Sequence, residues 1–176
     1  MHAKDSGRPG PDEYDVYYQP YIERVAQGPI LQALEEQRHE ILGLLGSLDG
    51  IAADYRYAPG KWSVKEVVGH VLDAERIFVI RALCVSRGEK QQLPGFEQDD
   101  YVRQGEFDRR SITSLAQEFE AVRLSSEALF RGLSPEQWLR SGTANDSRIS
   151  VRAAAFIVVG HAAHHTAVIR ERYLNH

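Results

Sequence analysis

The chain has 176 residues, which is the usual size of one domain. Its residues are 43% hydrophobic and 26% charged, a composition that excludes wholesale disorder. The single cysteine excludes a scaffold held together by disulfides. Its 21 basic and 25 acidic residues give a formal net charge of −4, which lacks the broad basic footprint that nucleic-acid binding requires. No apolar stretch approaches the roughly 20 residues that span a bilayer, and the N-terminus lacks the apolar region of a signal peptide, so we expect a cytoplasmic protein without nucleic-acid or membrane partners.

The start of the chain divides into a leader and the beginning of a domain. Residues 1–13 hold two prolines and two glycines among mixed charges and show no periodicity, which predicts a mobile leader. The remaining residues, 14–176, are expected to form one domain. It opens on a tyrosine-rich segment at 14–21, which predicts a short helix or an extended arm.

Two long helices are predicted in the first half of the domain. Apolar residues recur at helical spacing from 30 to 48, directly after Pro29, which suits a helix start. A sharper signal follows, because Ser63 and Glu66 have the spacing of a capping box in which each side chain bonds the other residue's backbone amide. The helix that they open is predicted to run from 64 to 87, with a wide apolar face.

The second half predicts two more long helices joined by irregular segments. Residues 88–109 contain a Pro-Gly pair and many polar residues, which indicates a long loop. A helix is predicted over 111–131, and a second capping box opens a short helix at 134–138. A loop at 141–149 then precedes a last helix over 151–173. We find no convincing strand alternation, so the predicted fold is all-α, a four-helix bundle.

Seven histidines are present, and two of them, His2 and His176, stand too close to the chain ends to be considered. His161 and His165 are four residues apart in the last predicted helix, about 40° apart on one face and one turn above the other, so they can share a metal ion. His164 lies three residues from His161, about 60° to the other side. Spacing alone therefore leaves open whether His164 or His165 partners His161.

A third candidate ligand, His70, lies in the second turn of the helix predicted at 64–87, on its apolar stripe. Three neutral imidazoles around a divalent cation, with a position left for water, form the open arrangement of catalytic metal sites. The competing hypothesis is a metal-free interaction domain whose histidines are satisfied within the core. Burying three histidines on apolar faces costs desolvation unless their nitrogens find a partner, which favours the metal.

Several short motifs spread over residues 28–173 resemble one known family, the DinB-like superfamily of metal-binding four-helix bundles. The residues that carry the resemblance are Gly60-Lys61-Trp62-Ser63, Glu66, Gly69-His70, Asp73-Ala74-Glu75-Arg76, Arg81, Leu93-Pro94-Gly95-Phe96, Arg123, Trp138-Leu139-Arg140-Ser141-Gly142, Gly160-His161 and His164-His165. The resemblance implies a metal triad of one histidine on the second long helix and an H-x-x-x-H pair on the fourth. Carried over to this chain, the triad is His70, His161 and His165, with His164 outside it.

The same resemblance implies a divalent metal, zinc or nickel, and a homodimer. Members of the superfamily include transferases that use bacillithiol or related low-molecular-weight thiols, a mycothiol-dependent isomerase and proteins described as metal-dependent hydrolases. We therefore expect a metal-dependent enzyme that transfers such a thiol to an electrophile or hydrolyses a small-molecule substrate. The alternative function is a non-catalytic, stress-associated metal-binding bundle in which the metal staples the helices.

Two further polar residues stand on the second long helix. Asp73 follows His70 by three residues and can either orient a ligand as a supporting carboxylate or pair with an arginine. Arg81 lies roughly 16 Å along the helix from His70, too far to reach the metal, and is expected to pair with Glu75 or Glu118. Both tryptophans flank helix starts and are expected to be packing anchors.

Overall fold

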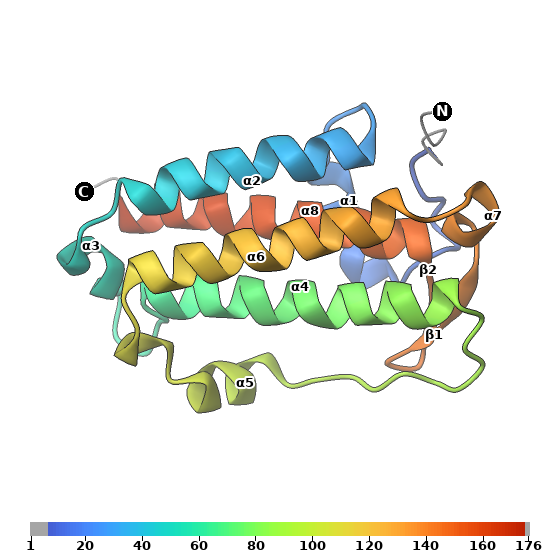
Figure 1. Ribbon diagram of the computed structural model, residues 1–176. Helices are drawn as coiled ribbons and strands as arrows, with labels where there is room; N and C mark the ends of the chain where they lie inside the picture. The colour runs from blue at the N-terminus through green and yellow to red at the C-terminus, as the bar shows by residue number, and fades with distance from the viewer. Residues whose placement is uncertain (1–6, 175–176) are drawn as a thin grey trace.

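Four long helices lie side by side in the computed structural model, which describes residues 7–174 (Figure 1). They are α2 (Ile30–Gly46), α4 (Val64–Ser86), α6 (Ile112–Arg131) and α8 (Val151–Val168). Both α2 and α4 pack against each of the other two, α6 and α8. The prediction of an all-α, four-helix bundle is therefore confirmed.

Shorter elements connect and cover the long helices. They are η1 (Val16–Tyr18), α1 (Gln19–Arg24), α3 (Gly50–Asp54), α5 (Gln98–Gly105), η2 (Phe107–Arg109), α7 (Pro135–Trp138), β1 (Ser141–Ala144), β2 (Ser147–Ser150) and the π-helical turn η3 (Ile169–Tyr173). The short helix predicted near 14–21 corresponds to η1 and α1. Helix α1 packs against α8, and α5 lies along α4 on the opposite edge of the bundle from α2 (Figure 1).

The helix starts follow the capping signals of the sequence. At the start of α4, the Glu66 N–H donates to Ser63 Oγ at 3.1 Å and the Ser63 N–H donates to the Glu66 carboxylate at 2.8 Å. The same reciprocal pair opens α7 at Ser134 and Gln137. These bonds satisfy amides that the first helical turn leaves without partners, which fixes where each helix begins.

The prediction of a loop over 88–109 is wrong in its second half, which forms α5 and η2. Two acidic residues, Asp99 and Asp100, stand in the first turn of α5, where they complement the positive end of the helix. Val102 and Phe107 are buried and attach the segment to the bundle. With so few apolar residues, the segment shows no helical period in the sequence.

The prediction of a loop over 141–149 is also wrong, because β1 and β2 form an antiparallel hairpin there. Asn145 and Asp146 take φ values of 50° and 59°, the backbone of a tight two-residue turn that these residue types tolerate. Leu93 adds a parallel bridge to Ala144. The alternation was missed because strands of four residues are too short to display it.

The apolar interior divides into two clusters along the bundle. One surrounds Phe78 and Phe156 and includes Trp138, whose ring stacks on Phe130, so this tryptophan is a packing anchor as predicted. The other surrounds Leu72 and includes the helix ends of α2 and α8. Within residues 7–174, no helix is both long and apolar enough to cross a membrane.

A buried polar network lies inside the bundle and joins all four long helices. The Arg123 side chain of α6, with 0% of its surface exposed, donates two hydrogen bonds of 2.9 Å to the Glu75 carboxylate of α4 and one of 2.9 Å to Gln37 of α2. Ser126 also donates to Glu75, and Gln37 donates to the Val159 carbonyl of α8. The network fixes the axial position of each helix against the others.

The prediction that Arg81 pairs with Glu75 or Glu118 is wrong. Glu75 is occupied by the buried network, and Glu118 pairs with Arg76. Arg81 instead donates a 2.7 Å hydrogen bond to the Pro94 carbonyl, which ties α4 to the segment that leads into α5. Sequence spacing could not choose among these partners because each choice depends on which helices pack together.

Part of the segment predicted as a leader over 1–13 packs against the bundle. Glu13 is 8% exposed, and its carboxylate accepts hydrogen bonds from Ser150 Oγ and Arg152 Nε, each at 2.7 Å, at the start of α8. A carboxylate is stabilised there by the positive end of the helix. Residues 1–6 lie outside the described residues, and the division of the chain at residue 14 stays a prediction.

The contribution of Glu13 to stability is expected to depend on pH. Burial has the largest effect and raises its pKa, but hydrogen bonds from Arg152, the Gly10 N–H and Ser150 together outweigh burial and lower the pKa from 4.5 to about 2. A carboxyl whose pKa falls on folding stabilises the protein fully above the higher value and loses that effect as pH drops toward the lower one. We expect Glu13→Gln to lower the free energy of unfolding by about 1–3 kcal/mol at pH 7.

Urea unfolding of the parent protein and Glu13→Gln at pH 7, 5, 4 and 3 measures this difference. It should stay constant down to about pH 4.5 and shrink below that value. A difference that is equally large at pH 7 and pH 3 would show that the charge of Glu13 is not what matters.

Candidate metal centre

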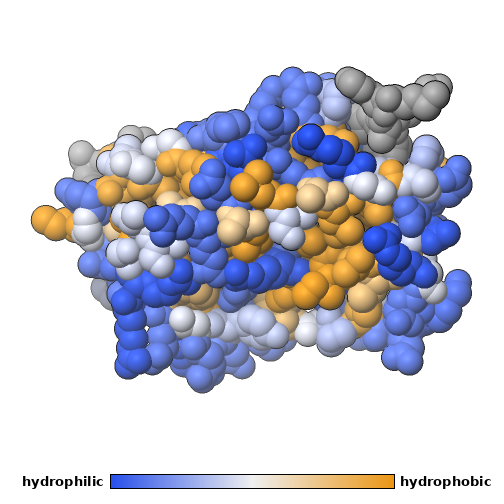
Figure 2. Space-filling model, viewed as in Figure 1, coloured by the Kyte–Doolittle hydropathy of each residue, from blue (hydrophilic) through white to orange (hydrophobic). Residues whose placement is uncertain are grey.

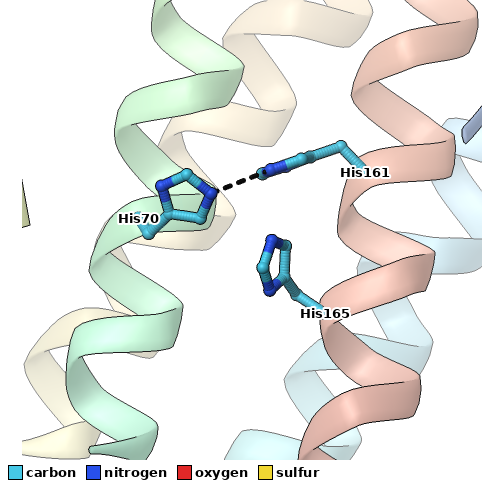
Figure 3. A group of neighbouring side chains, drawn as sticks. All are labelled: His70, His161 and His165. Carbon is cyan, nitrogen blue, oxygen red and sulfur yellow. Dashed lines mark hydrogen bonds between the residues drawn. The ribbon is translucent and has the colours of Figure 1, made fainter. Parts of the chain in front are cut away.

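Three histidines from two helices meet inside the bundle. His70 projects from α4, and His161 and His165 project from α8 toward it (Figure 3). The three offer one ring nitrogen each, and these nitrogens all lie within 4.8 Å of one another. The closest pair is His70 Nε2 and His161 Nε2, 2.9 Å apart. The structure thus brings together the three residues that the family resemblance implies as metal ligands.

The two helices position these side chains through their own periodicity and packing. His161 and His165 stand one helical turn apart, with ring centroids 4.5 Å apart, as four-residue spacing predicts. The buried residues at 153–155, in the first half of α8, are all alanines with small side chains, and α4 packs closely along this helix. His70 crosses the interface, with its ring centroid 4.8 Å from each of the other two.

His164 does not belong to this group, although its ring centroid lies 5.0 Å from that of His165. Its ring packs on Tyr21 of α1, with 5.6 Å between ring centroids, and it is not part of the group of three. The geometry therefore pairs His161 with His165, the choice that spacing left open. Of the other histidines, His39 is exposed on α2, and His2 and His176 lie outside the described residues.

Asp73, considered as a supporting carboxylate, faces an arginine. Its carboxylate lies 3.6 Å from the Arg76 guanidinium, and among residues 7–174 no hydrogen bond joins it to the three histidines. Burial raises the pKa of Asp73, and Arg76 opposes that shift. The contacts thus match the second interpretation of Asp73, an arginine partner.

Two aromatic residues of the site were not predicted. The Trp62 ring, expected only to anchor packing, lies 5.0 Å from the His70 ring, and the Tyr21 ring lies 5.3 Å from the His161 ring. Trp62 directly precedes the α4 capping box, so the sequence gave a weak indication that its ring lies near His70. The sequence gave no such indication for Tyr21, because the position of its ring depends on the packing of α1 against α8.

A glycine directly precedes a histidine on each helix and admits a covering element. A Cβ atom at Gly160 would stand 1.9 Å from the Tyr21 carbonyl oxygen, because the backbone of α1 crosses α8 at this point. A Cβ atom at Gly69 would stand 2.3 Å from the Phe107 ring of η2. A larger residue at Gly160 would displace α1, whose Tyr21 ring lies against His161, and a larger residue at Gly69 would displace the Phe107 ring.

The electrostatic environment keeps the three imidazoles neutral. Burial has the largest effect on the pKa of each ring. It lowers the pKa of His70 to about 4 and the pKa of His165 to about 3. It also holds the pKa of His161 well below its ordinary value. The neighbouring histidines lower the pKa of His161 further. Neutral imidazole is the form that binds a metal, and it is already the form present at pH 7.

The donor set fits a divalent transition metal. Two imidazole nitrogens bound at about 2.0–2.1 Å in a tetrahedral site are roughly 3.3 Å apart, so the separations in the structure require only small ring movements. Imidazole ligands suit zinc and nickel, whereas magnesium and calcium prefer oxygen. Three ligands leave at least one coordination position for another molecule.

Two cavities reach the three histidines. The first, the α1 cavity, has a volume of about 350 Å³, is walled by Tyr18, Phe78 and Phe96, and is lined by His70 and His161. The second, the η3 cavity, has a volume of about 490 Å³; Lys61, Trp62, Arg172 and His165 line it. Volumes in this range suit small molecules.

Comparisons with known proteins give one family match and two structural likenesses. A family model described as the DinB superfamily matches residues 33–169. YfiT from Bacillus subtilis, described as a probable metal-dependent hydrolase with an unusual four-helix bundle topology, is 21% identical, with a TM-score of 0.73 over 85% of this chain and 88% of its own.

The second solved structure is a mycothiol-dependent maleylpyruvate isomerase. It is 12% identical, with a TM-score of 0.64 over 85% of this chain, which spans 61% of the isomerase. No curated protein matches. At these identities the structural likenesses establish the fold.

Proposed function

The chain belongs to the DinB superfamily, and from that membership we propose that it is a cytoplasmic metal-dependent enzyme whose ligands are His70, His161 and His165. One observation carries the proposal: three neutral imidazoles, two of them buried and the third partly buried, converge where two cavities reach them. A structural metal site is normally closed by four protein ligands, whereas a catalytic one keeps a position open. The arrangement therefore supports catalysis.

The residues around the site have different proposed roles. A zinc or nickel ion held there would supply Lewis acidity, which lowers the pKa of a small nucleophile, water or a thiol. Three neutral histidines add no negative charge, so they leave the full charge of the ion for that purpose. Trp62 and Tyr21 cover the rings of His70 and His161 and exclude water from those sides.

We propose transfer of a low-molecular-weight thiol to an electrophile as the reaction and hydrolysis of a small substrate as the second candidate. Superfamily membership supports the first, and the description of YfiT supports the second. Both reactions require a small nucleophile at the open position. The competing proposal is a non-catalytic bundle in which the metal only links α4 to α8. That proposal does not explain why two cavities reach the histidines.

We also propose that the protein is a homodimer. Val16 and Tyr17, in the tyrosine-rich segment at 14–21, are 77% and 64% exposed. The face of α4 and α6 seen in Figure 2 shows hydrophobic residues among the polar surface, and Ile80, Leu83 and Leu124 are exposed on these two helices. Such side chains favour contact with a second copy.

Cobalt-substituted protein mixed with a small thiol tests the proposed chemistry. We expect a thiolate-to-cobalt charge-transfer band in the near ultraviolet, lost in His161→Ala. His164→Ala is the matched control and should keep the band, because His164 is not part of the group of three. If no thiol gives a band and no ester, amide or lactone is hydrolysed, the non-catalytic bundle is the better description.

A further inference from the structure

The three histidines lie between two separate cavities rather than at the end of one. His70 and His161 line the α1 cavity, and His165 lines the η3 cavity together with His164. The α1 cavity lies between α1, α4 and the β-hairpin, whereas the η3 cavity lies between the loop before α4 and the end of α8. Two molecules can therefore approach the same centre from different sides.

The two cavities differ in charge. Lys61 and Arg172 line the η3 cavity with one carboxylate, Asp99, which leaves an excess of positive charge. Asp15 and Glu97 line the α1 cavity, and no lysine or arginine is among its lining residues. A hydrogen bond from the Tyr17 N–H, with a smaller one from Ser147, lowers the pKa of Asp15, so this carboxyl is ionised at neutral pH. The α1 cavity therefore repels anions.

The two cations that line the η3 cavity stand outside the ion pairs of the described residues. Within residues 7–174, neither Lys61 nor Arg172 forms an ion pair, whereas Arg170, two residues away, pairs with Glu40 at 2.6 Å. The Arg172 guanidinium is held over the Tyr57 ring, 5.5 Å from its centroid, which leaves its N–H donors available. Lys61 and Arg172 are both exposed at the cavity, so an incoming anion can reach their donors.

We propose that the η3 cavity binds the carboxylate of one reactant through Lys61 and Arg172, while the α1 cavity takes the other, less polar reactant against its aromatic walls. The proposal deepens the proposed function and rests on it. The Trp62 and Tyr57 rings beside the two cations supply apolar surface for the body of the same molecule. An arginine and a lysine together can bind both oxygens of a carboxylate.

Binding to the metal-free protein tests the site without any turnover. Benzoate and benzamide have the same shape and differ in charge, so their dissociation constants, measured by calorimetry or by chemical-shift changes, isolate the charge. We expect benzoate to bind at least about tenfold more tightly than benzamide. Lys61→Gln combined with Arg172→Gln should abolish that preference and leave benzamide binding unchanged.

Arg170→Gln is the matched control, because Arg170 lies on the same turn, is paired with Glu40 and does not line the cavity. It should keep the benzoate preference. The proposal is overturned if the double variant keeps the preference, if Arg170→Gln removes it equally, or if Phe96→Ala in the α1 cavity removes it instead.

The readout separates this proposal from the proposed function. If benzoate binds as expected and the cobalt protein gives no thiolate band, the anion site stands and the proposed chemistry fails. If the band appears and benzoate shows no preference, the chemistry stands and the anion site fails. Phenyl phosphate is tested in parallel at about pH 5, where it and benzoate each carry about one negative charge. It should bind no more tightly than benzoate; tighter binding would assign the cavity to phosphate esters and contradict the carboxylate.

Discussion

His161→Ala is expected to lower metal affinity by more than about 100-fold. Loss of a residue that only hydrogen-bonds to a metal ligand already lowers metal affinity by about 10–100-fold, and loss of a ligand should lower it further. The same result is expected for His70→Ala and His165→Ala, since each ring supplies one of only three nitrogens. His164→Ala should leave affinity nearly unchanged because His164 is not one of the three histidines whose ring nitrogens converge. Metal content per chain, measured after dialysis of protein purified without a histidine tag, checks all four variants.

The four variants also separate the competing hypotheses. Retention of metal by His165→Ala with loss in His164→Ala would show that the pairing on α8 was assigned to the wrong residue. If none of the four variants changes the metal content, the histidines are core residues of a metal-free domain. Circular dichroism of each variant excludes unfolding as the cause of any loss.

Arg123→Met is expected to destabilise the protein by about 3–5 kcal/mol, because it leaves the buried Glu75 carboxylate without its counter-ion. The side chains of this pair are 0% and 2% exposed, so water cannot replace the lost partner. Folded proteins of this size have free energies of unfolding of only about 5–15 kcal/mol, so the loss is a large fraction of the total. Urea unfolding measures it.

A double variant distinguishes the lost pair from lost volume. Arg123→Met combined with Glu75→Leu replaces both charges by apolar groups and should be less destabilised than the sum of the single variants, because no unpaired charge remains buried. Arg76→Met is the control; its side chain is 42% exposed in its pair with Glu118, so a loss below about 1 kcal/mol is expected. Additive losses in the double variant would contradict the role assigned to the pair.

The long helices could be predicted because their signals are local. Ser63 and Glu66 mark a helix start through bonds within one turn, and the apolar period of α6 is visible over 20 residues. The hairpin and α5 were missed because their stability comes from contacts with distant segments. Leu93, for example, donates its N–H to Thr143, a partner that no local pattern reveals.

The candidate site was predictable only in part, for the same reason. Helical spacing placed His161 beside either His164 or His165, and the family resemblance was needed to choose. The ring of Tyr21 and the cations of the η3 cavity come from elements whose positions depend on tertiary packing. The partner of Arg81 was predicted wrongly because Arg123, from another helix, already occupies Glu75.

The glycines that precede His70 and His161 have a consequence for recognising this kind of site in other sequences. An H-x-x-x-H spacing alone occurs in many helices and has a high false-positive rate. Glycine inside a helix costs roughly 0.5–1 kcal/mol relative to alanine, so its presence at both Gly69 and Gly160 needs a local reason. Here the reason is steric, since each position is filled by a neighbouring element. A search pattern that requires Gly-His on two helices therefore selects for helices against which a neighbouring element packs closely, as well as for the ligands.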